Sequence, residues 1–310
     1  MSYLKLIRYP NLLIIILTQY LLRYCIIQPF LSGTGYNILI SNLDFFLLVL
    51  STVFIAAAGY AINDYFDLQS DQVNRPGSLI LGTKIPAKKA IILHWIFNVL
   101  GVIIGLYLGW KTHSVLIAAI NFITSVALWF YSVVLKKMPL TGNVLVSLLS
   151  ALVLYFPWIF TLKMLKGFHP AEEVYGLQYQ VANVMVECFA SFAFLANLFR
   201  EIVKDAEDIE GDAVRRCQTL PIIMGVKKIR IVLIVVLLII FAQLVLFQLI
   251  FSQVKLTAAF RYFSFVLQPF LFILIYFTWI SGVKKDFTRL SLLAKLLMLA
   301  GIIGMVFIAL

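Results

Sequence analysis

The stretch NDYFDLQSD, residues 63–71, carries three carboxylates at the spacing DxxDxxxD: Asp64, Asp67 and Asp71. The same spacing returns in KDAEDIEGD, residues 204–212, with Asp205, Asp208 and Asp212. On a helix the offsets i, i+3 and i+7 place all three side chains of a cluster on one face. Three like charges on one face repel, so we expect each cluster to hold a cation. Hard oxygen ligands suit Mg²⁺ or Mn²⁺.

The rest of the chain is strongly apolar. Hydrophobic residues make up 63% of it, charged residues 13%, and the mean hydropathy is +1.01. Apolar runs of about 17 to 23 residues, long enough to cross a bilayer as helices, recur along the chain. We therefore predict an all-α integral membrane protein with about nine transmembrane helices, near residues 12–31, 45–61, 90–108, 115–135, 144–162, 181–199, 229–251, 262–280 and 290–310.

The basic residues predict the orientation. With the N terminus inside, 18 of the 25 Lys and Arg fall before span 1 or after spans 2, 4, 6 and 8. The positive-inside rule then places both aspartate clusters on the cytoplasmic side, and we expect the protein in the inner (plasma) membrane of the cell. The net charge of +11 reflects this topology and contact with membrane lipids or an anionic substrate, and nothing in the pattern indicates nucleic acid.

The chain also looks doubled within a single domain, residues 1–310. The first cluster follows span 2 and the second follows span 6, and each leads into a basic, proline-bearing loop that ends in a Lys pair. Spans 1–4 and 5–8 then form two parallel four-helix halves, with span 9 appended. Parallel repeats commonly place a site at the interface between halves, so we expect the clusters to face each other.

Two facing carboxylate sets that hold divalent ions would bind a polyphosphate, which completes the metal shell. A nucleotide site would normally show a glycine-rich phosphate loop, and neither GxxxxGK[ST] nor GxGxxG occurs. A long apolar interior fits a prenyl diphosphate better. The ions would neutralise the departing diphosphate while an allylic cation forms.

These residues resemble the UbiA superfamily of intramembrane prenyltransferases. NDYFDLQSD resembles its first aspartate-rich motif, and REIVKDAEDIEGDAVRRCQTLPI is similar to the second motif of its archaeal-lipid branch, typified by digeranylgeranylglyceryl phosphate synthase. YSVVLKKMPLTGN, residues 131–143, resembles the segment after the fourth helix. IRYPN, residues 7–11, resembles the Arg-Pro-x-Asn entry, although Tyr9 is inserted between Arg8 and Pro10.

The resemblance implies nine helices around a central cavity, with Mg²⁺ as cofactor. It assigns the six aspartates to metal binding and catalysis, and Tyr131 to a place near the allylic carbon. It assigns substrate binding to Asn63, Arg75, Lys136 and Lys137, and we add Asn11 of the entry segment. We also expect Arg8 and Arg215 to bind substrate, because an acceptor with an anionic head would meet the basic residues of the cytoplasmic segments. The two lysines would also serve as membrane anchors without any substrate.

The implied reaction is prenyl transfer from a prenyl diphosphate to an acceptor. The second motif favours a prenylglyceryl phosphate, and an aromatic quinone precursor such as 4-hydroxybenzoate is the alternative. A CDP-alcohol phosphotransferase is a distant alternative, but LQSD follows Asp67 where its DGxxAR pattern would continue. An ion-coupled transporter would need carboxylates near mid-membrane. Arg23, inside span 1, is either a functional charge or one that snorkels to the outer face.

Overall fold

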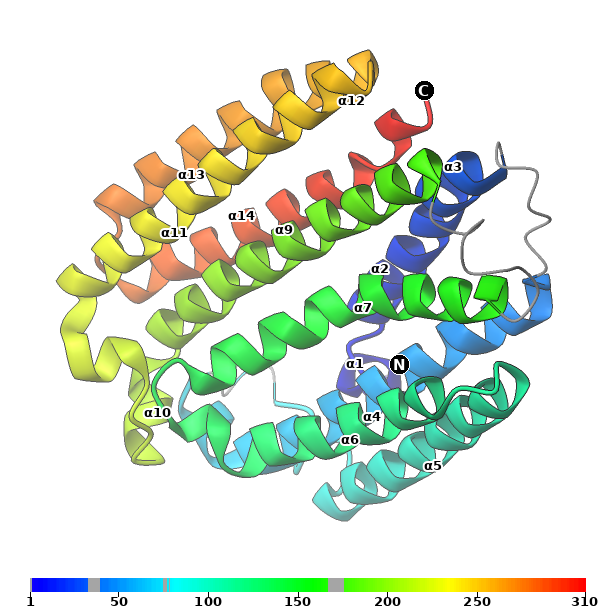
Figure 1. Cartoon of the computed structure of the whole chain (residues 1–310). Helices are drawn as coiled ribbons and strands as arrows, with labels where there is room; N and C mark the ends of the chain where they lie inside the picture. Colours follow the sequence, from blue (N-terminus) through cyan, green and yellow to red (C-terminus); the bar gives the residue numbers. More distant parts are fainter. Residues whose placement is uncertain (1, 33–39, 75–76, 78, 167–175) are drawn as a thin grey trace. The chain divides into compact units, whose positions relative to one another are not determined.

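The computed structural model describes residues 2–32, 40–74, 77, 79–166 and 176–310 (Figure 1). Across these residues the regular structure is helical, apart from one isolated bridge between Leu81 and Ile85. Nine helical stretches within the described residues are long and apolar enough to cross a membrane, and each overlaps one predicted span. The predicted all-α membrane fold is confirmed.

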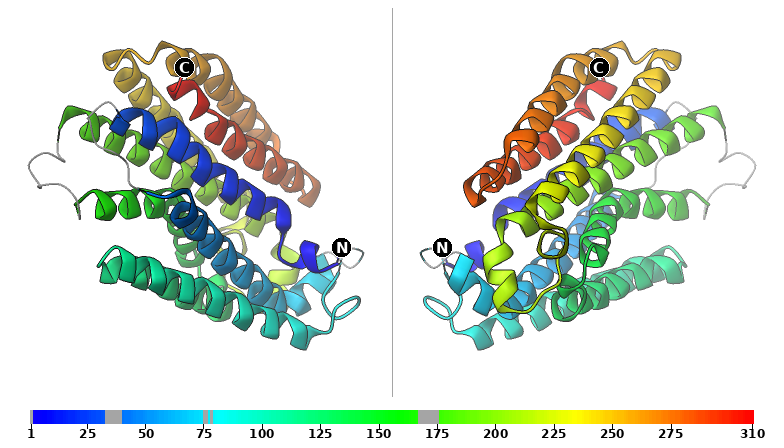
Figure 2. Two further views of the ribbon diagram at one scale, coloured as in Figure 1. Left: turned by 90° about the vertical axis from the view of Figure 1, so that its right-hand side faces the viewer. Right: turned by 90° about the vertical axis from the view of Figure 1, so that its left-hand side faces the viewer.

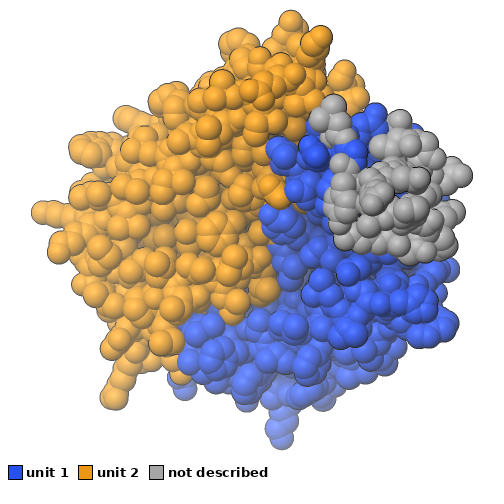
Figure 3. Space-filling model, in the orientation of Figure 1, with its two compact units in different colours: residues 1–135, 152–184 blue, residues 136–151, 185–310 orange. Residues whose placement is uncertain are grey.

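Contacts divide the chain into two compact units, coloured separately in Figure 3. Unit 1 comprises residues 1–135 and 152–184, and unit 2 comprises residues 136–151 and 185–310. The helices, in chain order, are α1 (Ser2–Leu6), α2 (Tyr9–Leu21), the π-helical turn η1 (Leu22–Ile27), α3 (Gln28–Ser32), α4 (Asn42–Asn74), α5 (Ala87–Lys111), α6 (Val115–Val133), η3 (Leu135–Lys137), α7 (Thr141–Lys166), α9 (Leu177–Glu207), α10 (Ile209–Val214), α11 (Leu220–Gln253), α12 (Thr257–Tyr262), η4 (Phe263–Leu267), α13 (Gln268–Ile280), α14 (Lys284–Ile303) and η5 (Val306–Ile308). The chain passes between the units at three points: between Leu135 and Lys136, inside α7 and inside α9. The predicted repeat of spans 1–4 in spans 5–8 therefore remains a prediction.

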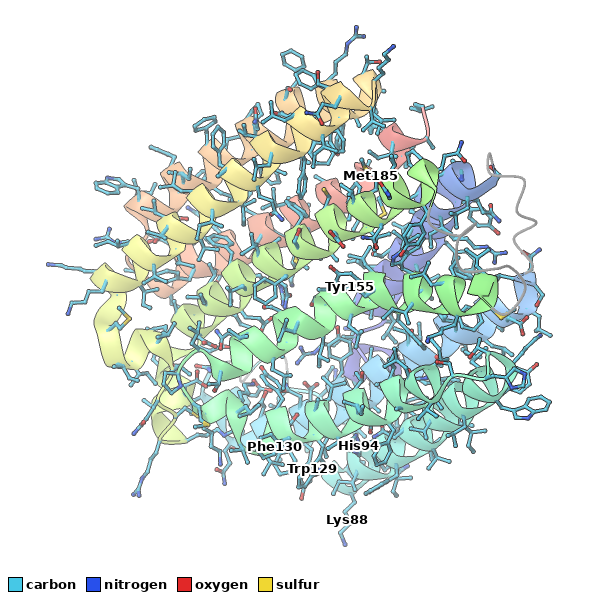
Figure 4. All side chains as sticks on the ribbon, viewed as in Figure 1. Lys88, His94, Trp129, Phe130, Tyr155 and Met185 are labelled. Carbon is cyan, nitrogen blue, oxygen red and sulfur yellow. The ribbon has the colours of Figure 1, made fainter. Side chains whose placement is uncertain are left out.

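Within unit 1, α4, α5 and α6 run side by side and α2 packs on α4 (Figure 2). Glycines on α5 allow this close approach. A Cβ at Gly101 would lie 2.8 Å from Ile55 Cδ1 of α4, and one at Gly109 would lie 2.4 Å from Ala118 Cβ of α6. His94, labelled in Figure 4, adds a polar contact between the same helices, since its Nδ1 lies 3.0 Å from the Ala58 carbonyl oxygen.

The apolar core of unit 1 lies toward the beginning of α4. Phe45, Leu48 and Val49 of α4 are buried there with Phe156 and Phe160 of α7. From Phe45 to Asp64 the helix rises about 28 Å at its standard 1.5 Å per residue. Helix α4 therefore contributes to the apolar core of unit 1 near its first residues and bears the first aspartate cluster near its last residues.

Arg23 lies inside the first span and is only 4% exposed. Its guanidinium donates to the Ile40 carbonyl oxygen at 3.1 Å and to Asn42 Oδ1 at 3.0 Å, and it lies 4.5 Å from the centre of the Phe45 ring. The buried charge is thus hydrogen-bonded to the start of α4. Arg23 is thereby tied to the start of α4, and the two interpretations of its charge, a functional one and one that reaches toward the outer face, remain predictions.

Pro157 interrupts the hydrogen bonding of α7. It has no N–H to donate to the carbonyl oxygen of Val153, four residues earlier. Gln19 of α2, which is fully buried, supplies the missing donor: its Nε2 lies 3.0 Å from that oxygen. Because the hydrocarbon core of a bilayer supplies no water to satisfy such a carbonyl, the Gln19 side chain both completes the hydrogen bonding of α7 and joins α2 to it.

In unit 2, α11 packs on α12 and α13, and α13 packs on α14. Leu233, Leu237, Ile240 and Leu244 form the buried stripe of α11 at spacings of three and four residues. Gly225 interrupts α11 near its start, where the backbone has φ 77° and ψ 158°. A residue with a side chain would be strained in this conformation, so glycine permits the sharp turn that leads the chain from α10 into the long span.

We predict that the cost of losing Gln19 depends on Pro157. Gln19→Leu leaves the Val153 carbonyl oxygen unpaired, whereas in a Pro157→Ala background the N–H of residue 157 can pair with it. The free energy lost on Gln19→Leu should therefore be smaller by about 1 kcal/mol in that background. Unfolding in mixed detergent micelles measures all four proteins of this cycle.

Thr18→Val is the control, because the Thr18 hydroxyl bonds within its own helix, to the Ile14 carbonyl oxygen at 2.7 Å. Its effect should be the same in both backgrounds. Equal costs of Gln19→Leu with and without Pro157 would show that Gln19 does not repair α7.

Candidate active site

The first aspartate cluster lies on the last turns of α4, which runs unbroken to Asn74. The prediction of one continuous helix for this cluster is confirmed. Asp67 is only 4% exposed, and its Oδ2 accepts a 2.7 Å hydrogen bond from Asn63 Nδ2. Asp64 and Asp71 are half-buried. Each carboxylate of the cluster therefore sits at the border between the helix packing and the polar end of the unit.

Two residues of the predicted N-terminal entry, Arg8 and Asn11, lie beside this cluster. Arg8 Nη2 is 2.6 Å from Asp64 Oδ1, and the guanidinium stacks 5.1 Å from the centre of the Tyr60 ring. Asn11 Nδ2 donates to the Tyr60 hydroxyl at 3.3 Å. Burial by itself lowers the pKa of Arg8, but the charges of Asp64 and Tyr60 and the hydrogen bond to Asp64 outweigh it and raise that pKa. Sequence analysis missed Tyr60, which lies one turn before Asp64.

The second cluster does not lie on one helix, so that part of the helix prediction is wrong. Helix α9 ends at Glu207, Asp208 has φ −101° and ψ 12°, and α10 begins at Ile209. The first cluster has the same spacing of like charges and stays helical, so repulsion alone does not explain the bend; Gly211, which lowers helix propensity, is present only in the second cluster. The bend re-aims Asp212 relative to Asp205, although the Asp212 N–H still reaches the Asp208 carbonyl oxygen at 3.0 Å.

Asp205 is held by Asn143, which sequence analysis did not single out. Asn143 lies near the start of α7 and its Nδ2 donates to Asp205 Oδ2 at 2.8 Å. The arrangement repeats that of the first cluster, where Asn63 donates to Asp67. The signal available in the sequence was the last residue of YSVVLKKMPLTGN, the segment already quoted for its lysines.

The predicted basic residues of unit 2 gather around Cys217. This thiol is buried, which raises its pKa; Asp212 raises it further, whereas Arg215, Lys136 and Lys137 act in the opposite direction. A backbone hydrogen bond of 2.8 Å from the Gln218 N–H to the Lys137 carbonyl oxygen joins the two segments. Charges that are about 80 residues apart in the sequence thus lie together beside Asp212.

Two further predicted site residues are Tyr131 and Arg75. Tyr131 is half-buried near the end of α6, in unit 1. Arg75 lies outside the described residues. The expectation that the two aspartate clusters face each other remains a prediction.

The first cluster fits a hard divalent cation by its chemistry. Its donors are carboxylates and an amide, and within the described residues the Oδ1 of Asn63 is a buried acceptor with no hydrogen-bond partner. A buried amide oxygen without a hydrogen-bond partner, on a helix that also carries carboxylates, suits a hard cation such as Mg²⁺. The described side chains do not form a ready-made group of three or more His, Cys, Asp or Glu ligands, and Asp64 is engaged by Arg8.

The model of one protein family matches residues 30–306, which include both clusters: the UbiA prenyltransferase family. The chain belongs to this family. It is 36% identical to digeranylgeranylglyceryl phosphate synthase of Pyrococcus horikoshii over 59% of this chain and 57% of that relative, so the match spans little more than half of the relative's length. It is 30% identical to the Methanosarcina mazei enzyme of the same name over 73% of this chain and 72% of that one.

Solved structures of the UbiA family share the fold. A digeranylgeranylglyceryl phosphate synthase structure aligns with a TM-score of 0.63 at 22% identity and covers 98% of both chains. A UbiA homologue from Archaeoglobus fulgidus, bound to GPP and Mg²⁺, aligns with a TM-score of 0.52 at 16% identity, over 98% of this chain and 99% of that one. At these identities the likeness establishes the fold of this UbiA family member.

We predict that Asn143 increases the affinity of the second cluster for a divalent cation by orienting Asp205. Asn143→Leu removes the donor that orients Asp205, and loss of such an outer hydrogen bond typically weakens metal binding about 10- to 100-fold. Electron paramagnetic resonance of Mn²⁺ in the presence of diphosphate measures the change. Asn197→Leu is the matched control, because Asn197 Nδ2 contacts Ser147 Oγ at 3.5 Å rather than a carboxylate. Unchanged Mn²⁺ affinity in Asn143→Leu would contradict the assignment.

Proposed function

We propose that this UbiA family member is a Mg²⁺-dependent prenyltransferase that moves a prenyl group from a prenyl diphosphate to a prenylglyceryl phosphate. The observation that carries the proposal is the pair of aspartate clusters, each braced by an asparagine: Asn63 on Asp67, and Asn143 on Asp205. Family membership and the names of the relatives from Pyrococcus horikoshii and Methanosarcina mazei support it.

The residues of the clusters would share the work of binding the donor. Asp64, Asp67 and Asp71 with Asn63 would form one ligand set, and Asp205, Asp208 and Asp212 the other. When bound, Mg²⁺ supplies charge neutralisation for the diphosphate leaving group. The structure of the A. fulgidus homologue with GPP and Mg²⁺ supports this choice of cofactor and donor class.

The remaining predicted residues would act on the parts of the substrates that the aspartates do not hold. Lys136 and Lys137, with Arg75, would bind diphosphate oxygens as the C–O bond to the prenyl group breaks. Tyr131 would lie near the allylic carbon, where its ring could stabilise the developing positive charge. The hydroxyl of the acceptor then bonds to that carbon and loses its proton, which leaves an ether and free diphosphate as products.

An acceptor that bears a phosphate explains the surplus of basic residues. Besides Lys136 and Lys137, which would bind the donor, the predicted cytoplasmic segments carry more basic residues than one metal-bound diphosphate needs: Arg8, Arg75, Arg215, Arg216, Lys227 and Lys228. A guanidinium binds phosphate oxygens in a bidentate manner. A neutral aromatic ring would not need this surplus, so an aromatic quinone precursor such as 4-hydroxybenzoate is the second candidate acceptor.

The membrane orientation is part of the same proposal. The bias of basic residues toward alternate loops supports a cytoplasmic location for both clusters in the cell's inner membrane. A cytoplasmic site would meet a water-soluble diphosphate product and lipid substrates at the same membrane surface. The CDP-alcohol phosphotransferase and transporter alternatives have no supporting observation, and the family match disfavours both.

We predict that single aspartate variants abolish turnover without unfolding the protein. Asp64→Asn and Asp208→Asn each remove a charged ligand at a polar helix end, so turnover of a prenyl diphosphate should fall by about two or more orders of magnitude. EDTA should stop the reaction and Mg²⁺ should restore it. Diphosphate release from detergent-purified protein is the measurement.

Glu210→Gln provides the control, because Glu210 is an exposed acidic residue whose contact is a 3.7 Å ion pair with Lys284. It should retain turnover. Survival of activity in both aspartate variants would refute the site, and unfolding of both would make the clusters structural.

We also predict the acceptor preference. With a long prenyl diphosphate, prenylglyceryl phosphate should be used in preference to 4-hydroxybenzoate or a dihydroxynaphthoate, and Arg215→Ala should raise the KM for the acceptor more than that for the donor. Radiolabel transfer to each acceptor tests both statements. Transfer to an aromatic acid with none to the glyceryl phosphate would overturn the assigned acceptor.

A further inference from the structure

Arg8 lies at an unusual point of the backbone. It joins α1 to α2 with φ 52° and ψ 52°, the left-handed conformation that residues other than glycine seldom adopt. Such a conformation persists only where its surroundings impose it. The backbone on both sides is fixed: the Arg8 N–H reaches the Lys5 carbonyl oxygen at 3.0 Å, and the Asn11 N–H reaches the Arg8 carbonyl oxygen at 2.8 Å.

Helix α1 provides the anchor that imposes this conformation. Leu6, almost fully buried, packs with Leu81, Ile85 and Ala90 in a small core between α1 and the start of α5. Residues 80–85 form a compact turn there, in which the Gly82 N–H donates to the Ile85 carbonyl oxygen at 2.8 Å. The root of the Arg8 side chain is thus fixed in unit 1 independently of its charged end.

The charged end of Arg8 is held more loosely than its root. The side chains of Arg8 and Asp64 are 30% and 21% exposed, so water reaches the ion pair. Because water reaches the pair, the guanidinium can change partners without being left unpaired in an apolar environment. The Tyr60 ring under the guanidinium and the Asn11 bond to the Tyr60 hydroxyl define the resting position.

We propose that Arg8 is a displaceable counter-charge of the first cluster, which holds Asp64 Oδ1 until a divalent cation arrives together with a diphosphate. The proposal rests on the function proposed above and assigns Arg8 a role toward both ligands. A cation that binds alone must displace Arg8 from Asp64 without offering it a new partner. A cation that arrives with diphosphate brings phosphate oxygens, and the guanidinium then moves from the carboxylate to the phosphate.

This exchange couples the two ligands. Binding of the cation alone costs the free energy of the Arg8–Asp64 ion pair. Binding of the cation–diphosphate complex offsets that cost, because the Arg8 guanidinium gains a phosphate partner. Coupling of this kind requires differential contacts in two states, and here the two states differ in the partner of one guanidinium. Removing the Arg8 charge should therefore affect the two ligands in opposite directions.

The test uses the full chain in detergent, with Mn²⁺ alone and with a preformed complex of Mg²⁺ and inorganic diphosphate as probes. Arg8→Gln should bind Mn²⁺ alone about tenfold more tightly than the unmodified protein, and should bind the complex about tenfold more weakly. Electron paramagnetic resonance measures the first affinity and isothermal titration calorimetry the second. Tyr60→Leu, which removes the ring beneath the guanidinium, should tighten Mn²⁺ binding by a smaller factor.

Lys5→Gln is the matched control, because it removes the same charge from an exposed side chain on α1, three residues away. Both of its affinities should stay within about twofold of those of the unmodified protein. Thermal unfolding shows whether each variant is folded. If Arg8→Gln does not fold, the Mn²⁺ affinity of Tyr60→Leu tests the counter-charge role instead.

The outcomes separate the two proposals. Unchanged or weaker Mn²⁺ binding in the folded Arg8→Gln protein would overturn the counter-charge role while leaving the prenyltransferase proposal intact. Weaker binding of both probes would show that Arg8 only maintains the structure. Failure of the unmodified protein to bind either probe would overturn the proposed function and this inference together.

Discussion

The carboxylates at the ends of α4 and α9 must stay hydrogen-bonded next to a helix interior that is almost entirely apolar. Burying such a group without a partner costs several kcal/mol, and one carboxylate of the second cluster and two of the first have a named side-chain donor within their own unit. Arg8 holds Asp64, Asn63 holds Asp67, and Asn143 holds Asp205. The rest of each unit is arranged to bring these donors to the helix ends: α1 and the turn after α4 fix Arg8, and the start of α7 presents Asn143.

The same constraint governs the interior of the spans. A carbonyl freed by Pro157 is met by Gln19, and the charge of Arg23 is met by the Ile40 carbonyl and Asn42. These polar contacts join helices that otherwise touch through apolar side chains and glycines, as at Gly101 and Ile55. Because hydrophobic burial gives little preference for one helix partner over another inside a bilayer, such specific contacts fix which helices pair. The position of α4, and with it the first cluster, depends on them.

The two clusters position their carboxylates with different backbone structures. The first lies on an unbroken helix, so its carboxylates are spaced by the helix alone, whereas the bend at Asp208 separates the second into two short segments. An Asn amide orients one carboxylate in each case. Beyond the bend, Asp212 lies near Cys217 together with Arg215, Lys136 and Lys137, so the second cluster combines carboxylates with lysines and an arginine. A metal–diphosphate complex needs both kinds of group.

The sequence by itself determined the class of fold and predicted the residues of the candidate site. Runs of apolar residues dictate membrane helices because a bilayer leaves no other way to satisfy the backbone, and the spacing of Asp64, Asp67 and Asp71 dictates a shared helical face. Only the tertiary structure decided which partner each carboxylate has. Asn143 is 62 residues from Asp205, and Arg8 is 56 residues from Asp64, so no local periodicity could have paired them. The bend at Asp208 was equally hidden, because helix continuation there is a balance between local charge repulsion and packing, and packing is a property of the folded chain.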